Sequence, residues 1–179
     1  MRDPETGELL PHGTPGELEL TGPSRMSEYF GNADATAAAL TEDGFLRTGD
    51  LGFTQADGSF VFVSRMGDVL RLSGFLVSPS EIEAHLQTHP AVEGAQVVGV
   101  TVGTKPQPFA FVVPKPGAGF DAEALRQHCA RGLARYKVPV AVMPLDEFPT
   151  TKSPNGVKIQ RARLRDMAAE WARSQGAAA

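Results

Sequence analysis

The chain lacks the features that mark secreted, membrane-spanning and nucleic-acid-binding proteins. Its 179 residues include one cysteine, Cys129, so an internal disulfide is impossible and a reducing compartment is favoured. No apolar run approaches the roughly 20 residues of a transmembrane helix, and residues 1–7 lack the apolar core of a signal peptide. The net charge of −4 argues against general binding to nucleic acid or anionic membranes. We therefore predict a soluble, cytoplasmic protein with no membrane span and no nucleic-acid partner.

What is present is an ordinary globular composition, with 41% apolar residues, arranged in two unlike parts. Residues 1–62 are rich in Gly, Pro, Asp and Thr, with short apolar runs between turns. The strands and the short helix expected in this part lie at residues 17–20, 45–47 and 60–63 and at residues 34–40. Asp57-Gly58 is a hairpin signal between the last two strands. This part is therefore predicted to be a β-rich scaffold.

After residue 65, helices and strands alternate as in a small α+β domain. The expected strands lie at residues 69–72, 75–77, 94–100, 108–113 and 138–145, and the last helix at residues 164–175. Ser80 is predicted to cap a helix over residues 81–88, with Glu83 completing a capping box. Asp121 is predicted to cap a further helix. The apolar face of that helix consists of Ala124, Leu125, Cys129 and Leu133.

Four short motifs follow one another along the chain. They are Leu46-Arg47-Thr48-Gly49-Asp50, the run at residues 64–74, the run at residues 78–83, and Ser153-Pro154-Asn155-Gly156-Val157-Lys158-Ile159. Each motif alone is weak, but their order is specific. Together they resemble, over about residues 13–165, the C-terminal portion of the adenylate-forming (AMP-binding) acyl-CoA synthetases. The resemblance implies an α+β fold, with residues 1–66 as the β-rich end of a large N-terminal adenylation domain and residues 67–179 as a small mobile C-terminal domain.

Lys158 is the candidate catalytic residue. When a carboxylate attacks the α-phosphorus of ATP, charge builds on the bridging oxygens, and a cation placed there favours the transition state. A lysine supplies a compact charge on a flexible stem, and the Asn155-Gly156 turn before it allows positive φ. The resemblance implies that Lys158 contacts the acid carboxylate and the α-phosphate. A solvated surface lysine is the alternative for such a motif standing alone.

Asp50 and Arg65 are the candidate nucleotide-binding residues. A carboxylate following Thr48-Gly49 at a turn can accept two hydrogen bonds from a ribose diol. The resemblance assigns that task to Asp50 and an assisting one to Arg65. An Asx-turn aspartate and a scaffold arginine are the alternatives.

The expected hinge departs from the commoner pattern of the family. Gly67, followed by Asp68, stands where relatives usually carry Asp or Lys at the pivot between the two domains. Glycine leaves rotation possible, so a less sharply bistable pivot is predicted. Ser73 and Gly74 match the segment that lines the pantetheine tunnel of CoA, and a plain hairpin glycine is the alternative for Gly74. Arg71 stands where many relatives have lysine, so no second lysine role is carried over.

The remaining candidates are weaker. His85 and His89 are spaced i and i+4 on a predicted helix, but no third ligand for zinc is evident, and no metal site is predicted. Cys129 is expected in the core. Residues 136–139 resemble a family segment that lies near the CoA path.

The chain contains no Gly/Ser/Thr-rich phosphate loop, no adenine platform and no acyl pocket, which the family carries in its large N-terminal domain. We therefore expect the C-terminal part of an AMP-forming acid–thiol ligase, with ATP, Mg²⁺ and CoA as cosubstrates, a fatty or other carboxylic acid as substrate, and the missing N-terminal domain as partner, in the same chain or as a separate subunit. The fragment alone is expected to be inactive. A carrier-protein-loading adenylation domain and a non-catalytic binding or regulatory module are the alternatives.

Overall fold

The computed structural model describes residues 1–153 and 156–176, which divide into two compact units, Met1–Val69 and Leu70–Ala179. The expected domain boundary between residues 66 and 67 stays a prediction. Within the described ranges no helix has both the length and the apolar character needed to cross a membrane.

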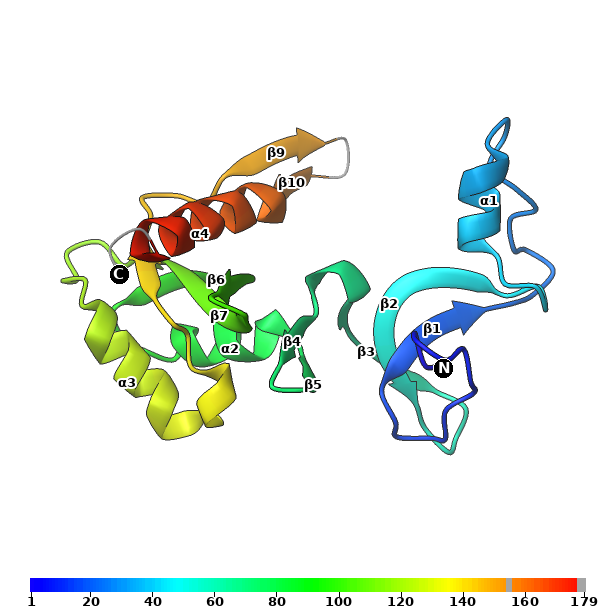
Figure 1. Cartoon of the computed structure of the whole chain (residues 1–179), viewed down its shortest axis with the longest axis horizontal. Helices are drawn as coiled ribbons and strands as arrows, with labels where there is room; N and C mark the ends of the chain where they lie inside the picture. The colour runs from blue at the N-terminus through cyan, green and yellow to red at the C-terminus, as the bar shows by residue number, and fades with distance from the viewer. Residues whose placement is uncertain (154–155, 177–179) are drawn as a thin grey trace. The chain divides into compact units, whose positions relative to one another are not determined.

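The first unit is built on a three-stranded antiparallel sheet, with the strands in the order β1-β2-β3 (Figure 1). The strands are β1 (Gly16–Leu20), β2 (Leu46–Thr54) and β3 (Phe60–Arg65), and the helix α1 (Ala33–Ala39) lies between β1 and β2 in the chain. Asp57 Oδ1 accepts a hydrogen bond from Ser59 N at 2.9 Å, and Gly58 has φ +85°. The tight β2–β3 turn that Asp57-Gly58 predicted is therefore confirmed, as are the strand at 17–20 and the short helix.

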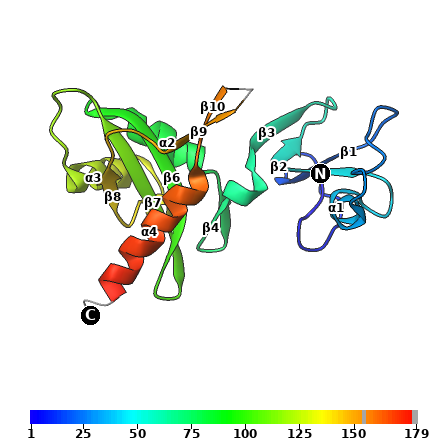
Figure 2. The same cartoon turned by 90° about the horizontal axis from the view of Figure 1, so that it is seen from above.

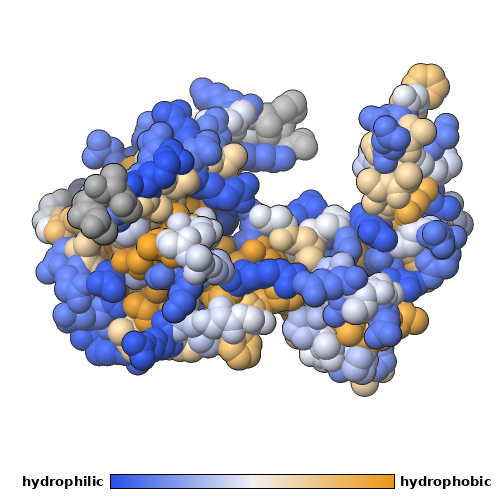
Figure 3. Space-filling view, viewed as in Figure 1, coloured by the Kyte–Doolittle hydropathy of each residue, from blue (hydrophilic) through white to orange (hydrophobic). Residues whose placement is uncertain are grey.

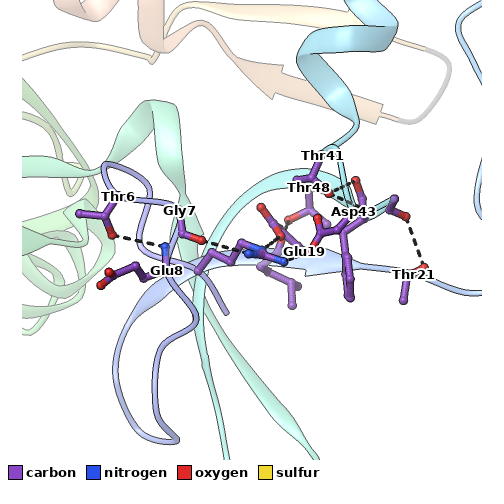
Figure 4. Close-up of polar contacts among 12 residues, drawn as sticks. Thr6, Gly7, Glu8, Glu19, Thr21, Thr41, Asp43 and Thr48 are labelled. Atoms are coloured by element: carbon purple, nitrogen blue, oxygen red, sulfur yellow. Dashed lines mark hydrogen bonds and ion pairs between the residues drawn. The ribbon is translucent and has the colours of Figure 1, made fainter.

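Arg2 ties the N-terminal segment to this sheet. Its Nε donates to Glu19 Oε2 at 2.6 Å and its Nη1 donates to Gly7 O at 3.0 Å. It also forms an ion pair with Asp43, in the turn before β2. Figure 4 draws these polar contacts, with Gly7, Glu19 and Asp43 labelled. One arginine thus holds three segments of a unit that has few buried apolar side chains.

The first unit also leaves large apolar side chains on its surface beside α1. Phe30 is fully exposed and Tyr29 is about half exposed. In Figure 3 an apolar patch is visible at the end of the unit that carries α1. Most other groups on this surface are hydrophilic.

The second unit is a three-layer α/β/α arrangement around a mixed sheet (Figures 1 and 2). Strand β6 (Val92–Val102) pairs antiparallel with β7 (Lys105–Pro114), which pairs in parallel with β8 (Val142–Pro144). The helices α2 (Pro79–Gln87) and α3 (Ala122–Gly132) cover one face, and α4 (Arg161–Gly176) covers the other. The α+β class expected from the sequence is confirmed.

The two faces of this sheet form two cores, because side chains alternate along a strand. On β7, Ala110 and Val112 join the core under α2 and α3. Phe109 and Phe111 join the core under α4, where the Phe109 ring meets the Trp171 ring edge-on with centroids 5.1 Å apart. Both faces of β6 and β7 are thus buried, which explains their near-continuous apolar sequence.

The helix starts test the two capping predictions. Asp121 Oδ1 accepts from Glu123 N and Ala124 N, each at 3.0 Å, as predicted for α3. The capping box over Ser80 and Glu83 is wrong. Because Pro79 occupies the first helical position, α2 begins earlier, with Ser78 as its N-cap and no side-chain capping bond.

Two hairpins and one short 3₁₀ turn complete the described part of the second unit. A hairpin of β4 (Leu70–Leu72) and β5 (Phe75–Val77) precedes α2, and a second hairpin of β9 (Thr150–Ser153) and β10 (Gly156–Ile159) precedes α4. Short 3₁₀ turns lie at Met66–Asp68, in the first unit, and at Arg135–Lys137. Figure 2 shows the β9–β10 hairpin and α4 extending in opposite directions from the place where they join. The helix α4 starts three residues before the predicted helix and extends to Gly176.

Candidate functional site

Asp50 and Arg65 lie opposite each other on adjacent strands of the first unit. Asp50 is on β2 and pairs in register with Arg65 on β3. The expected turn at Asp50 is instead an irregularity inside the strand, where Gly49 has φ +69° and the β1–β2 register shifts. Thr48 Oγ1 donates to Leu18 O at 2.7 Å and accepts from Asp50 N at 3.1 Å, which holds the bulge. The bulge aims the carboxylate of Asp50 toward Arg65.

The carboxylate of Asp50 is only partly satisfied. Its Oδ1 lies 3.0 Å from Arg65 Nε as an ion pair. The same atom is inaccessible to solvent, and no hydrogen-bonding partner for it is found among the described residues. Arg65 Nη1 donates instead to Thr48 O at 3.0 Å. The ion pair with Arg65 offsets part of the cost of leaving this buried oxygen without an aligned hydrogen-bond donor.

The residues of the expected hinge lie on the 3₁₀ turn Met66–Asp68. A Cβ at Gly67 would meet no atom within 4 Å, and Gly67 does not have a positive φ. Neither space nor backbone strain therefore requires glycine here in this conformation. The hinge role of Gly67 and Asp68 stays a prediction.

Ser73 and Gly74 form the two-residue turn of the β4–β5 hairpin. Their φ angles are +52° and +86°, the pattern of a type I′ turn that joins Leu72 to Phe75. A Cβ at Gly74 would meet nothing within 4 Å, so the positive φ explains the glycine in this conformation. The expected hairpin is confirmed, and the pantetheine role stays a prediction.

A pocket of about 700 Å³ adjoins this turn within the second unit. Its lining residues are Ser73, Lys105, Pro106, Gln107, Pro108, Arg135, Tyr136 and Val138. The Tyr136 ring stacks on the Phe75 ring, with centroids 4.9 Å apart. The pocket thus brings the Ser73 turn together with part of the 136–139 segment, and it adds Lys105 and Arg135, which the sequence did not single out.

Those two cations could not have been found from local patterns. Lys105 begins β7 directly after the β6–β7 turn, and Arg135 begins a 3₁₀ turn after α3. Nothing in the sequence around either residue differs from that of a solvated surface cation. Both line the pocket and bring two positive charges to it, which suits an anionic ligand.

Lys158 lies on β10 in the second unit, opposite Thr151 of β9. Its side chain is exposed, and no partner for its ammonium group is found in the part of the chain that the structure describes. Gly156 has φ +111°, as expected of a glycine in a turn. Pro154 and Asn155, which complete the predicted turn, lie outside the described residues. A lysine so placed is available to an incoming anion.

Three histidines meet between α2 and α3. The His85 and His128 rings stack with centroids 4.5 Å apart, and the His89 ring lies edge-on to His128 at 5.2 Å. His128 Nε2 is 2.8 Å from Thr88 Oγ1, and His85 Nε2 is 3.1 Å from His128 O. Among the described residues, no three acidic, histidine or cysteine side chains are arranged to hold a metal ion. Burial, helped by the neighbouring His85, His89 and Arg131, lowers the pKa of His128.

Cys129 lies in the core as expected, fully buried beside the helix α2. Burial raises the pKa of its thiol to about 11. A thiol of that pKa stays protonated near neutrality and is a poor nucleophile.

Comparison with known proteins agrees with this geometry. Residues 81–155 match the family described as "AMP-binding enzyme C-terminal domain". The chain is 37% identical over 164 residues to 4-coumarate–CoA ligase 5 of Oryza sativa subsp. japonica, covering 91% of this chain and 30% of that protein. It is 41% identical over 159 residues to a sulfoacetate–CoA ligase of Cupriavidus necator, covering 88% and 31%.

Among solved structures, the ATP-bound MatB of Rhodopseudomonas palustris superposes with a TM-score of 0.83 at 32% identity, over 93% of this chain and 33% of that one. In sequence and fold the chain is therefore similar to the C-terminal third of adenylate-forming enzymes. The chain belongs to the AMP-binding enzymes and contains their C-terminal domain. It spans about a third of the length of the relatives it matches.

Proposed function

We propose that the chain is the C-terminal part of an ATP-dependent acyl-CoA ligase of the cytoplasm, an acid–thiol ligase that forms AMP. The observation that carries the proposal is the identity of 37–41% to named CoA ligases over about nine-tenths of the chain. Residues 1–66 then end a large adenylation domain, and residues 67–179 form the small mobile domain. ATP, with Mg²⁺ as its counter-ion, CoA and a carboxylic acid are the substrates.

In the first half-reaction a carboxylate oxygen of the acid attacks the α-phosphorus, an acyl-adenylate forms and pyrophosphate leaves. Lys158 is the cation that we assign to the negative charge that builds on the acid carboxylate and the α-phosphate. Its exposure on β10 supports this role, because the ammonium group is reachable by a ligand. In a water-excluded site one such cation is worth about two to three orders of magnitude in rate.

Asp50 and Arg65 are the proposed nucleotide-binding residues of the same ligase. The Asp50 side chain is 22% exposed although its Oδ1 is covered, so we expect the other carboxylate oxygen to accept from a ribose hydroxyl. Arg65, 3.0 Å from Oδ1, would hold the carboxylate in place. An ionised carboxylate only accepts hydrogen bonds, which suits a hydroxyl donor.

In the second half-reaction the thiol sulfur of CoA attacks the acyl carbonyl carbon, and AMP leaves with the bonding electron pair. The pocket beside Ser73 and Gly74 is the proposed path of the pantetheine arm. Lys105 and Arg135 at its mouth suit an anionic ligand. Rotation at Gly67 and Asp68 is the proposed step between the two half-reactions.

A fatty acid is the substrate that we propose. The named relatives act on 4-coumarate and sulfoacetate, so a panel of fatty, aryl and short polar acids has to be tested. The rate of pyrophosphate exchange by the complete ligase with each acid shows which acid it activates. Exchange with fatty acids supports the proposal, and exchange confined to the other acids contradicts this part of it.

Lys158→Ala in the complete ligase tests the catalytic assignment. Pyrophosphate exchange should fall by roughly 10²–10³-fold, whereas thioester formation from supplied acyl-adenylate should remain. Lys152→Ala is the matched control, because Lys152 is the other exposed lysine of the same hairpin. Equal loss of both half-reactions, or no loss of exchange, would overturn the assignment.

A further inference from the structure

The hairpin that carries Lys158 has little packing of its own. Exposed residues make up β9 from 150 to 152 and the whole of β10, and they include the apolar Val157 and Ile159. The two strands pair with each other over four residue pairs, from Gly156–Ser153 to Ile159–Thr150. Because this two-stranded ribbon packs no apolar face against a core, the residues where it joins the domain set the direction in which it points.

The base of the hairpin is fastened on both strands. Gln160 N donates to Pro149 O at 2.8 Å, and Gln160 Nε2 donates to Thr150 O at 3.1 Å, which closes the ribbon on itself. The next residue, Arg161, reaches away from the ribbon into the domain. Its Nη1 donates to Val97 O at 3.3 Å on β6, and its Nη2 donates to Glu83 Oε1 at 3.0 Å on α2.

Glu83 is one of two polar or charged residues found buried among the described residues, and it is 8% exposed. Its Oε1 also accepts from Val97 N at 2.9 Å. One carboxylate and one guanidinium therefore hold both polar backbone groups of Val97 and connect α2, β6 and the start of α4. The planar guanidinium suits this better than an ammonium group, because two of its nitrogens bind two acceptors in a fixed geometry.

A buried ion pair of this kind is often no more stabilising than apolar side chains of the same size, because both charges lose their hydration. Fixing one geometry among alternatives is the best-attested use of such pairs. The geometry fixed here is the direction in which the chain leaves β10 and enters α4. Lys158 lies three residues before Arg161. In an extended chain, at about 3.3 Å per residue, this separates the two residues by roughly 10 Å, so a rotation at Arg161 is magnified at Lys158.

We propose that Glu83 and Arg161 are positioning residues that aim Lys158 at the acyl-phosphate centre. This inference rests on the proposed function of Lys158. A rotation of the hairpin base by a few degrees moves the ammonium group by a large part of an ångström. Misplacement by about 1 Å at a reacting centre costs up to roughly 10²-fold in rate.

Hydrogen–deuterium exchange of the complete protein tests the structural half without any activity. Glu83→Gln keeps an acceptor for Val97 N but removes the charge that holds Arg161. Amides of residues 156–161 should exchange several-fold faster, with those of β7 and α3 unchanged. Glu123→Gln is the control, because Glu123 forms an exposed ion pair with Arg126 at 2.8 Å. Uniformly faster exchange through the domain, or no change at the hairpin, would overturn the proposal.

Kinetics of the complete ligase tests the positioning half. Glu83→Gln should lower kcat for adenylation by about 10- to 100-fold and leave KM for ATP unchanged. Arg161→Lys keeps the charge but loses the second nitrogen that binds an acceptor. Its kcat should lie between those of the wild type and Glu83→Gln. Arg163→Gln, on an exposed position of the same helix, should behave as the wild type. A rise in KM at constant kcat, or wild-type kcat, would overturn the proposal.

Failure of this inference can be told apart from failure of the proposed function. If Lys158→Ala abolishes exchange of pyrophosphate and Glu83→Gln does not change it, the positioning role is wrong and the catalytic lysine stands. If Lys158→Ala has no effect, the proposed catalytic role of Lys158 fails, and the positioning role fails with it whatever hydrogen exchange shows.

Discussion

Two arginine–carboxylate pairs, one in each unit, differ in what surrounds them. In the first unit Asp50 and Arg65 expose 22% and 65% of their side chains, and one carboxylate oxygen accepts no hydrogen bond among the described residues. In the second, Glu83 and Arg161 expose 10% and 26%, and both groups bind the backbone of Val97. The first pair is the more exposed, whereas both members of the second pair are bound to the backbone of the fold. The roles that we propose differ accordingly, with ligand binding at the first pair and architecture at the second.

The largest effect on stability is expected at the second pair. Glu83→Ala removes the partner of a half-buried guanidinium and the acceptor of Val97 N. Loss of a buried pair costs several kcal/mol, and discounting for the exposure of Arg161 leaves about 2–3 kcal/mol. Urea unfolding followed by Trp171 fluorescence measures it, because Trp171 lies on α4 in this unit. Glu123→Ala, which breaks an exposed ion pair, is the reference. If Glu83→Ala lowers the unfolding free energy no more than Glu123→Ala does, the architectural role of the second pair is wrong.

At the first pair the effect is expected on the ligand and hardly on the fold. Asp50→Ala in the complete ligase should weaken ATP binding by about 10- to 100-fold, the size of one charge-assisted hydrogen bond. The unfolding free energy should change by less than about 1 kcal/mol, because the Arg65 side chain is 65% exposed and stays hydrated without its partner. Isothermal titration with ATP and a matched urea curve measure the two quantities. Unchanged ATP affinity would contradict the binding role.

A smaller effect is expected at the turn beside the pocket. Gly74→Ala puts a Cβ on a residue with φ +86°, which costs about 1–2 kcal/mol even though the space around it is open. Gly67→Ala, where φ is not positive, is the matched control and should cost less in this conformation. Thermal unfolding of the two variants compares them. Equal losses would show that the turn does not hold its φ in solution.

The smallest effect is expected from pH. The pKa of His128 is lowered in the folded state, chiefly by burial, so the unfolded chain binds the proton first as pH falls. Stability is therefore full above the usual histidine pKa near 6.5 and declines below it. His128→Gln should reduce the fall in the urea unfolding midpoint between pH 7.5 and 5.5. His12→Gln, in the first unit, should leave that fall unchanged. An unchanged slope for His128→Gln would assign the pH dependence to other groups.

Much of the local structure could be predicted because it depends on neighbours in the chain. The cap at Asp121 forms with amides two and three residues on, and the Ser73-Gly74 turn needs only its own backbone angles. The paired strands β6 and β7 followed from continuous apolar runs. The capping box at Ser80 failed for a local reason as well, since Pro79 moved the helix start.

Candidate ligand-binding residues were predicted only where the family motifs run through them. Asp50, Arg65, Ser73 and Lys158 lie within such motifs. Lys105 and Arg135 do not, and they join the pocket because separate segments of the second unit come together there. Asp50 was expected on a turn, but a bulge inside β2 presents it instead.

The sequence by itself determined the family, the α+β class, the Asp121 cap and the tight turns at Asp57-Gly58 and Ser73-Gly74, because these depend on residue type and short spacing. Only the tertiary structure decided what Glu83 does. Its partner Arg161 lies 78 residues away, and no local pattern reports a contact across that distance. The same holds for His128, which meets His85 from 43 residues away. Burial of an apolar core brings such side chains together, and it makes their charges matter by removing water from around them.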